Sequence, residues 1–228
     1  MKKQILLIVL ILLSNNIRAQ ITSGVDSVFG SLDTSEMNTD LLYDKGFNSE
    51  FYKNYNGSND QSCSFNNWQQ LYSGIFFGQM NLVRSLPTLQ EVMQQARDYH
   101  KENADVLPLL ILNYKYDVFK SNVFEDNLIA IQNGVFLDQP STESPYEEGR
   151  FFASAAISNR IRSLQMKYFI GSEFYFTNDE EIPLSIEIDF DDGIGYRNVN
   201  FNQTITVNYI DTQSKTIKVK FNYASKII

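Results

Sequence analysis

The sequence contains one cysteine and one histidine in 228 residues, and this scarcity excludes several kinds of site. One cysteine cannot form a disulfide bond within the chain. One histidine, His100, cannot supply the ligands of a zinc protease. The sequence also lacks the G-x-S-x-G elbow of a serine hydrolase and a glycine-rich loop, followed by a helix, that would hold a phosphate. The commonest hydrolytic and nucleotide-binding centres therefore have no counterpart here.

Basic residues are also few, because 19 lysines and arginines stand against 27 acidic residues and give a net charge of −8. A protein that binds phosphate backbones needs a basic face. We therefore expect no nucleic-acid partner, and no electrostatic attraction to an anionic membrane.

One long hydrophobic run stands at the N-terminus, at residues 5–13, after Lys2 and Lys3. Polar residues follow, and Ala19 marks a plausible cleavage point, as in a signal peptide. The run is well short of the roughly 20 residues that span a bilayer, so we expect no transmembrane anchor after removal of residues 1–19. The sequence has no cysteine near the cleavage point, so we expect no lipid attachment there. The sequence predicts a bacterial protein that is secreted or periplasmic.

Two helices are predicted in the first half of the chain. The first covers residues 67–84, with Asn66 or Asn67 as its cap, and Gly74 and Gly78 are placed to admit another backbone closely. Its apolar face consists of Trp68, Leu71, Tyr72, Ile75, Phe76 and Leu82. The second opens with the capping box Thr88-Leu89-Gln90-Glu91. His100 lies near its C-terminal end, where the helix dipole favours it; a metal or catalytic role would need partners one turn away, and the sequence has none there.

Strand-like alternation follows Pro108 and dominates from Arg150 onward. Asn133-Gly134 is a strong hairpin signal, and the loop 138–145 is rich in residues that break secondary structure. We expect further strands at residues 109–118, 135–137, 151–157, 161–170, 174–176, 185–190, 198–201, 204–209 and 216–223. The predicted fold class is α+β: a small mixed region with two helices at residues 20–145, then an antiparallel immunoglobulin-like β-sandwich at residues 146–228.

The stretch Ile188-Asp189-Phe190-Asp191-Asp192-Gly193, followed by strands at 205–209 and 215–220, resembles the PKD-type immunoglobulin-like domain. Asp191 stands where that family has its first glycine, and Ile188 stands where it has tryptophan. The resemblance covers about the last 70 residues. It implies that the Asp-Gly turn is structural, with the aspartate accepting backbone N–H bonds.

Residues 107–116 and Ser144-Pro145-Tyr146, together with the signal peptide and the PKD-like end, resemble the N-terminal region of large bacterial proteins exported by the type IX secretion system. Some members of that group continue into an α/β-hydrolase-like domain and a C-terminal sorting domain. The resemblance implies that this chain, which ends at Ile228, lacks both.

Acidic residues concentrate near the turn of the PKD-like segment. Asp189, Asp191 and Asp192 are candidate calcium ligands, since carboxylate oxygens suit that ion. A wider acidic group adds Asp179, Glu180, Glu181 and Glu187 to these three residues. The second interpretation of this group is a carboxylate pair for glycoside hydrolysis, and the third is that its residues form solvated strand faces and turns.

Two other features leave alternatives open. Cys63 is either a partly buried small residue or a reactive or intermolecularly bonded thiol. The aromatic residues Tyr43, Phe47, Phe51, Tyr52 and Tyr55 either form a contact surface, for example for stacking on carbohydrate, or pack their loop onto its own domain.

These observations favour an exported, non-catalytic interaction or adhesion-type module, whose partner is an unidentified surface protein or glycan. The alternative is an accessory N-terminal region, truncated or degenerate, of a secreted α/β-hydrolase-like enzyme. We expect no catalytic residues and, apart from the candidate calcium ion, no cofactor.

Overall fold

The structure is a computed structural model that describes residues 24–57, 61–80, 86–103, 106–157 and 163–228. The predicted signal peptide, residues 1–19, lies outside the described residues. Residues 24–29 are helical. The other helical elements are η1 (Thr34–Glu36), α2 (Tyr43–Gly46), η2 (Glu50–Asn54), α3 (Phe65–Gly78), α4 (Leu89–Glu102) and η3 (Ser172–Phe174). The strands are β1 (Val106–Phe119), β2 (Ile129–Gln132), β3 (Val135–Asp138), β4 (Tyr146–Ala156), β5 (Gln165–Ile170), β6 (Tyr175–Thr177), β7 (Ser185–Asp189), β8 (Arg197–Val199), β9 (Gln203–Asn208) and β10 (Lys218–Asn222).

The long strand β1 lies inside the main sheet and pairs with β4, β5 and β6. The main sheet has the order β4-β1-β5-β9, and β6 also pairs with β1. β1 runs antiparallel to β4 from Leu109↔Ala156 to Phe119↔Tyr146, and parallel to β5 and β6. Its sequence is apolar at successive positions because both of its faces are covered.

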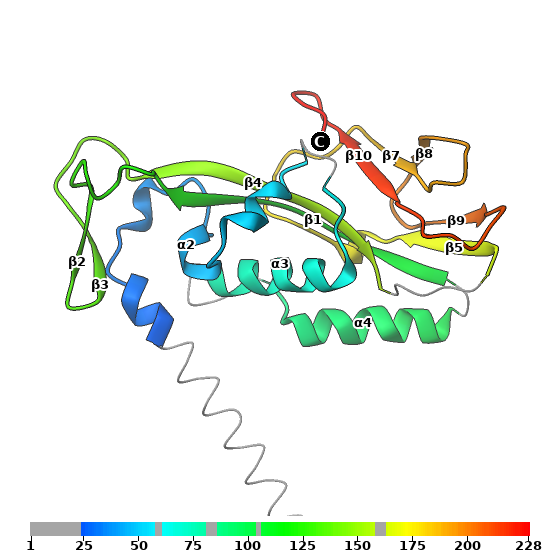
Figure 1. Cartoon of the computed structure of the whole chain (residues 1–228), viewed down its shortest axis with the longest axis horizontal. Coiled ribbons are helices and arrows are strands. Elements are labelled where there is room, and N and C mark those ends of the chain that lie inside the picture. The colour runs from blue at the N-terminus through cyan, green and yellow to red at the C-terminus, as the bar shows by residue number, and fades with distance from the viewer. Residues whose placement is uncertain (1–23, 58–60, 81–85, 104–105, 158–162) are drawn as a thin grey trace, which may run out of the picture.

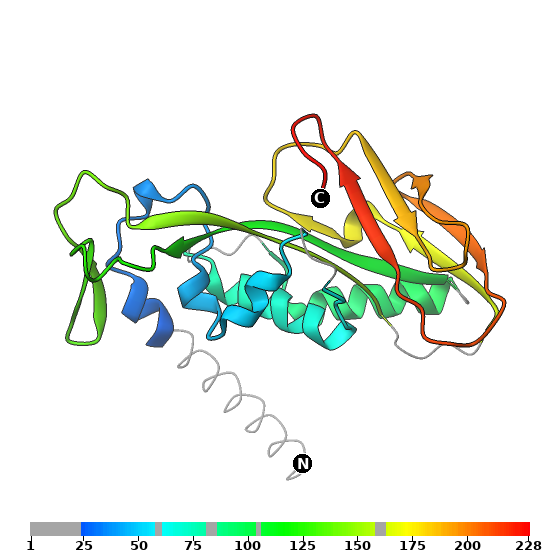
Figure 2. The same cartoon turned by 45° about the horizontal axis from the view of Figure 1, so that its top comes forward.

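The molecule has three layers (Figure 1). Helices α3 and α4 cover one face of the main sheet, and a second sheet of order β10-β7-β8 covers part of the other face. Successive residues of β1 point to opposite faces, so Leu110 and Leu112 pack with the helices while Leu109 and Ile111 pack with the small sheet. Figure 2 shows the same layers from a second direction.

The class α+β is therefore confirmed, whereas the arrangement of the strands differs from the expectation. The main sheet is mixed rather than purely antiparallel, because β1 pairs with β5 and β6 in parallel. β4 begins at Tyr146 and pairs with β1 along its length. The division predicted between residues 145 and 146 therefore does not separate two sheets, since strands from both sides of it build the same one.

Helix α3 begins and ends earlier than its periodicity predicts. Its cap is Ser64, whose hydroxyl accepts a hydrogen bond from the Asn67 N–H at 3.1 Å, rather than Asn66 or Asn67. It ends at Gly78, because Gln79 adopts an extended conformation and pairs with Leu41. The rest of the predicted helix, residues 81–84, lies outside the described residues.

The predicted glycine contact in α3 is present. Gly46 of α2 lies so close to this helix that an added Cβ would be 2.2 Å from the Gly74 carbonyl oxygen. A Cβ on Gly74 would be 2.2 Å from Cε1 of Phe47, and one on Gly78 would be 2.9 Å from the Leu42 carbonyl oxygen. The glycines therefore let α2 and the chain beside it pack directly on α3.

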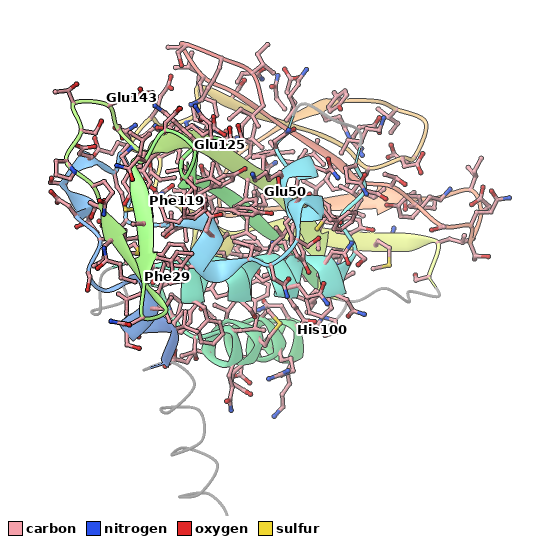
Figure 3. All side chains as sticks on the ribbon, turned by 60° about the vertical axis from the view of Figure 1, so that its left-hand side comes forward. Phe29, Glu50, His100, Phe119, Glu125 and Glu143 are labelled. Atoms are coloured by element: carbon pink, nitrogen blue, oxygen red, sulfur yellow. The ribbon has the colours of Figure 1, made fainter. Side chains whose placement is uncertain are left out.

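Two predictions from local sequence are confirmed. Thr88 and Glu91 form the capping box of α4, with both reciprocal hydrogen bonds present. Asn133 and Gly134 join β2 to β3 with φ angles of 53° and 79°, the conformation of a type I′ hairpin turn. Phe136 of that hairpin packs against Phe29 and Phe119. Figure 3 labels Phe29 and Phe119.

Candidate functional site

A groove of about 920 Å³ lies where the two sheets meet at their edges. Among its lining residues are the end of β4, the start of β10, the loop that precedes β10, and residues 61–65. β4 is the outermost strand of the main sheet and β10 is the outermost strand of the small one. We call this hollow the strand-edge groove.

The hydrogen bonds of β10 show which backbone groups face the groove. Phe221 exchanges both of its backbone hydrogen bonds with Ile228, at 2.8 and 2.9 Å, and the Tyr223 N–H donates to the Lys226 carbonyl. Because backbone direction alternates along a strand, Val219 also turns its N–H and C=O away from β7. Within the part of the chain that the structure describes, no residue pairs with Val219 on that side.

The edge of β4 has the same character. The Phe152 N–H donates to the Tyr55 carbonyl at 2.7 Å on the side away from β1. Ser154 and Ala156 point their backbone groups to that same side, and both line the groove. Segments of this chain thus already extend both edges by a short pairing at one end of the groove.

Three residues close that end. Phe152 and Phe221 meet edge to face with ring centroids 5.4 Å apart, so β4 and β10 are in direct contact there. Gly57 lies against Ile228 and Phe152, since a Cβ added to it would lie 2.3 Å from Cγ2 of Ile228 and 3.1 Å from Cβ of Phe152. Beyond this contact the two edges continue along the groove.

The rim of the groove is basic, although the chain as a whole is acidic. Its charged lining residues among those described are Asp211, Lys215, Lys218 and Lys220. Lys215 pairs with Asp211 at 2.8 Å, and Lys220 pairs with Glu187 at 2.6 Å while lying 4.7 Å from the centre of the Tyr196 ring. Lys215 and Lys220 are thus each paired with an acid, Lys220 on the side of β7, whereas Lys218, next to Val219, forms no ion pair with the described residues.

Cys63 also lines this groove, and its environment favours the interpretation that it is a partly buried small residue and not a reactive thiol. Burial raises the pKa of Cys63 to about 12. Its Sγ lies 3.6 Å from the backbone carbonyl of Ser64. The thiolate, which is the nucleophilic form, is therefore disfavoured at neutral pH.

The three candidate calcium ligands hold the turn between β7 and β8 rather than meeting at one point. Asp189 accepts the Asp191 N–H, and Asp191, at φ 58°, accepts the Thr216 N–H. Asp192 accepts the Ile194 N–H and forms an ion pair of 2.8 Å with Arg197. Among the described residues, no group of three or more His, Cys, Asp or Glu side chains is placed to hold a metal ion. The calcium site stays a prediction.

The most strongly perturbed acid is Asp179, which sequence reasoning placed only within a larger group. Its buried carboxylate faces Arg150 at 2.8 Å, Lys226 at 3.0 Å and Lys115 at 3.7 Å. Burial raises the pKa of Asp179, but hydrogen bonds from Lys226, Arg150 and the Glu181 backbone outweigh this effect and lower it to about 2.

This ion cluster continues inward through Arg150 to the fully buried Asn113 of β1. The Asn113 side chain donates to the hydroxyls of Tyr223, at 2.7 Å, and Tyr175, at 3.1 Å. The network thereby ties β1, β4 and β6 to the chain after β10. Its polar groups all bind one another, so it serves to join the layers.

The aromatic residues of the N-terminal segment mostly pack inward. Tyr43, Phe47 and Tyr55 are buried and belong to the core beneath the helices. Phe51, by contrast, is 45% exposed. The interpretation that these residues fix their own loop is thus confirmed for the buried three.

His100 lies on α4 and its Nδ1 is 2.7 Å from the Val106 carbonyl oxygen. Figure 3 shows it well apart from Glu125 and Glu143. The histidine therefore links the end of α4 to the start of β1.

No family model matches this chain, and no curated protein or solved structure gives a significant match. In the described part of the chain, none of the helices has the length and apolar character needed to cross a bilayer. No local sequence pattern predicts the strand-edge groove. The nearest signal is Lys218-Val219-Lys220, since lysines commonly flank exposed strand edges.

Proposed function

We propose that this protein is an exported, non-catalytic interaction module that binds an extended, acidic segment of a partner protein in the strand-edge groove. The segment would add to β10 as a further strand, with backbone hydrogen bonds to Val219. The observation that carries this proposal is the pairing of Phe221 with Ile228, because here the same edge already pairs with another segment of backbone, two residues from Val219.

The geometry suits a short segment. A strand rises about 3.3 Å per residue and offers outward backbone groups at every second position. From the closed end at Phe221, the next outward positions are Val219 and then Ile217, and both line the groove. Main-chain bonds would provide affinity here, while the groove floor between the sheets would accept alternate side chains.

The charges select the kind of segment. Lysines at an edge discourage pairing with a second copy of the same edge, because like charges would then face one another. An acidic segment carries the opposite charge, so its carboxylates would be attracted to Lys218 and Lys220. We therefore favour an acidic partner over a neutral or basic one.

The test uses peptides as probes. A phage-displayed library of random 12-residue peptides is selected on the purified protein, and binders are synthesised and measured by fluorescence anisotropy. We expect acidic sequences rich in β-branched residues, with dissociation constants that rise roughly tenfold or more in Val219→Pro. Proline at this position removes an outward N–H and leaves the pairing with β7 in place.

Thr206→Pro is the matched control. The Tyr209 N–H donates to the Leu164 carbonyl within the β9–β5 pairing, so Thr206 turns its N–H to the opposite, outer side of β9. This variant removes one edge donor at a residue that does not line the groove. Peptides that bind wild type and Val219→Pro equally, or a library that yields no binder, would refute the proposal.

Export belongs to this proposal and rests on the signal-peptide pattern of residues 1–19. The immunoglobulin-like character of the C-terminal part and the relationship to type IX secretion substrates also belong to it, and they rest on the sequence resemblances. The alternative role beside a hydrolase domain rests on the same resemblance, and no contact in the structure favours it over the binding role.

A further inference from the structure

A second groove lies along α3, on the helix-covered side of the main sheet. Its volume is about 550 Å³, and it runs between α3 and the segment from Gly46 to Tyr52. The α3 side is a stripe of residues at helical spacing: Asn66, Gln69, Gln70, Ser73 and Phe77. We call this hollow the amide groove.

The amide groove carries no charge among the described residues that line it. The whole of α3 is likewise uncharged over its 14 residues, although it is a partly exposed helix. Charged residues make up 20% of the chain. Without a charged side chain the groove offers an ionic ligand no ion pair, which favours a neutral ligand.

Carboxamides supply the polar groups of the groove. Each offers two donors and an acceptor at one site, which matches the hydroxyl groups of a sugar, since these donate and accept as well. The Gln70 carboxamide oxygen accepts from the Tyr52 hydroxyl at 3.0 Å. Among the described residues, the side chains of Asn48, Asn66 and Gln69 form no hydrogen bond with the protein, so their amides remain available to a ligand.

An aromatic surface completes the groove. Phe77 is 46% exposed at one end of the stripe, and Tyr52 lies across from α3 with its hydroxyl held by Gln70. Aromatic rings with a polar neighbour bind the C–H face of a sugar while hydrogen bonds hold its hydroxyls.

The frame of the groove is rigid. The Phe47 ring lies directly against Gly74, and Gly46 lies against the backbone of α3. Phe47 also packs against the rings of Tyr43 and Phe151, with centroids 4.8 and 4.9 Å away. The Phe47 side of the groove is therefore already ordered before a ligand enters.

We infer that the amide groove binds a neutral oligosaccharide, with one sugar ring against Phe77 and the hydroxyl groups of the sugar units that follow along α3 on the amides of Gln69 and Asn66. This site is distinct from the strand-edge groove in place and in chemistry, and neither proposal depends on the other.

The experiment is affinity gel electrophoresis of the purified protein in native gels. Four gels contain neutral polysaccharides, namely glycogen, a β-1,3-glucan, an arabinoxylan and a galactomannan. Two contain the anionic polymers alginate and polygalacturonate. We expect slower migration in at least one neutral gel and unchanged migration in both anionic gels.

Two variants test the residues. Phe77→Ala removes the exposed ring, and Gln69→Glu keeps the size of the side chain while adding a charge. Each is expected to weaken the retardation by roughly tenfold, in line with the loss of one stacking or one hydrogen-bonding contact. Circular dichroism verifies that both variants are folded, and Val219→Pro should bind the polysaccharide like wild type.

Four results would overturn the inference. The first three are unchanged migration in all four neutral gels, retardation that survives both Phe77→Ala and Gln69→Glu, and stronger retardation in the anionic gels than in the neutral ones. Loss of retardation in Val219→Pro with retention in Phe77→Ala would also overturn it, because it would place the saccharide in the other groove.

Discussion

Gly74→Ala tests the packing that frames the amide groove. In an ordinary helix interior this change stabilises by about 1 kcal/mol, because alanine has the higher helix propensity. Here the new Cβ would lie 2.2, 2.3 and 2.7 Å from three atoms of the Phe47 ring. Overpacking of this kind costs about 1–3 kcal/mol.

The ring of Phe47 has little room to move away. It is buried, and it packs against Tyr43, Tyr52 and Phe151 with centroid distances between 4.8 and 5.3 Å. The overpacking cost should therefore exceed the gain in propensity. We expect a net loss of up to about 2 kcal/mol in the free energy of unfolding, measured by urea denaturation with an unchanged slope.

A double-mutant cycle isolates the cause. In a Phe47→Ala background the clashing ring is gone, so Gly74→Ala should become neutral or stabilising, and the coupling between the two changes should be about 1 kcal/mol or more. Gly74→Ala that stabilises the wild-type protein, or that destabilises both backgrounds equally, would refute the assigned contact.

The other predictions concern the polar network and the strand edge. Because the pKa of Asp179 is lowered to about 2, its carboxylate stabilises the fold fully above about pH 4, and this stabilisation is lost as the pH falls toward 2. Asp179→Asn should therefore lower the free energy of unfolding by about 2 kcal/mol at pH 7 and abolish that part of the acid dependence, as measured by urea titrations. Asp117→Ala removes the acceptor of the Asn38 and Thr39 N–H groups and of the Thr39 hydroxyl, and a loss of about 3 kcal/mol is expected; a loss under 1 kcal/mol would contradict these bonds. Lys218→Pro breaks a bond between β10 and β7 whereas Val219→Pro does not, so the first should lower the melting temperature by several degrees more; equal effects would contradict the register.

Local sequence predicted the parts of the fold that depend on neighbouring residues. The capping box at Thr88 and the turn at Asn133-Gly134 require contacts within four residues, and the sequence contains both partners. The alternation of Ile186 and Ile188 with Glu187 likewise reports a strand with one buried face. These features could be recognised without any knowledge of the rest of the chain.

Contacts between distant residues set the remainder, and no local pattern encodes them. Helix α3 ends where Gln79 pairs with Leu41, and β1 takes partners from both sides of the predicted boundary. Asp179 was one of seven acids in the acidic group singled out from the sequence, and its low pKa depends on hydrogen bonds from Lys226 and Arg150, which come from two other segments of the chain. The strand-edge groove depends on which strands end up outermost, and for that reason its key position, Val219, escaped prediction.

Amide hydrogen exchange at Val219, measured by NMR with and without an acidic peptide selected on the protein, tests the binding role most directly. We expect exchange of the Val219 amide to slow when the peptide binds, while the amides of Lys218 and Lys220, which already face β7, exchange as before. A bound peptide that leaves Val219 unchanged would contradict it.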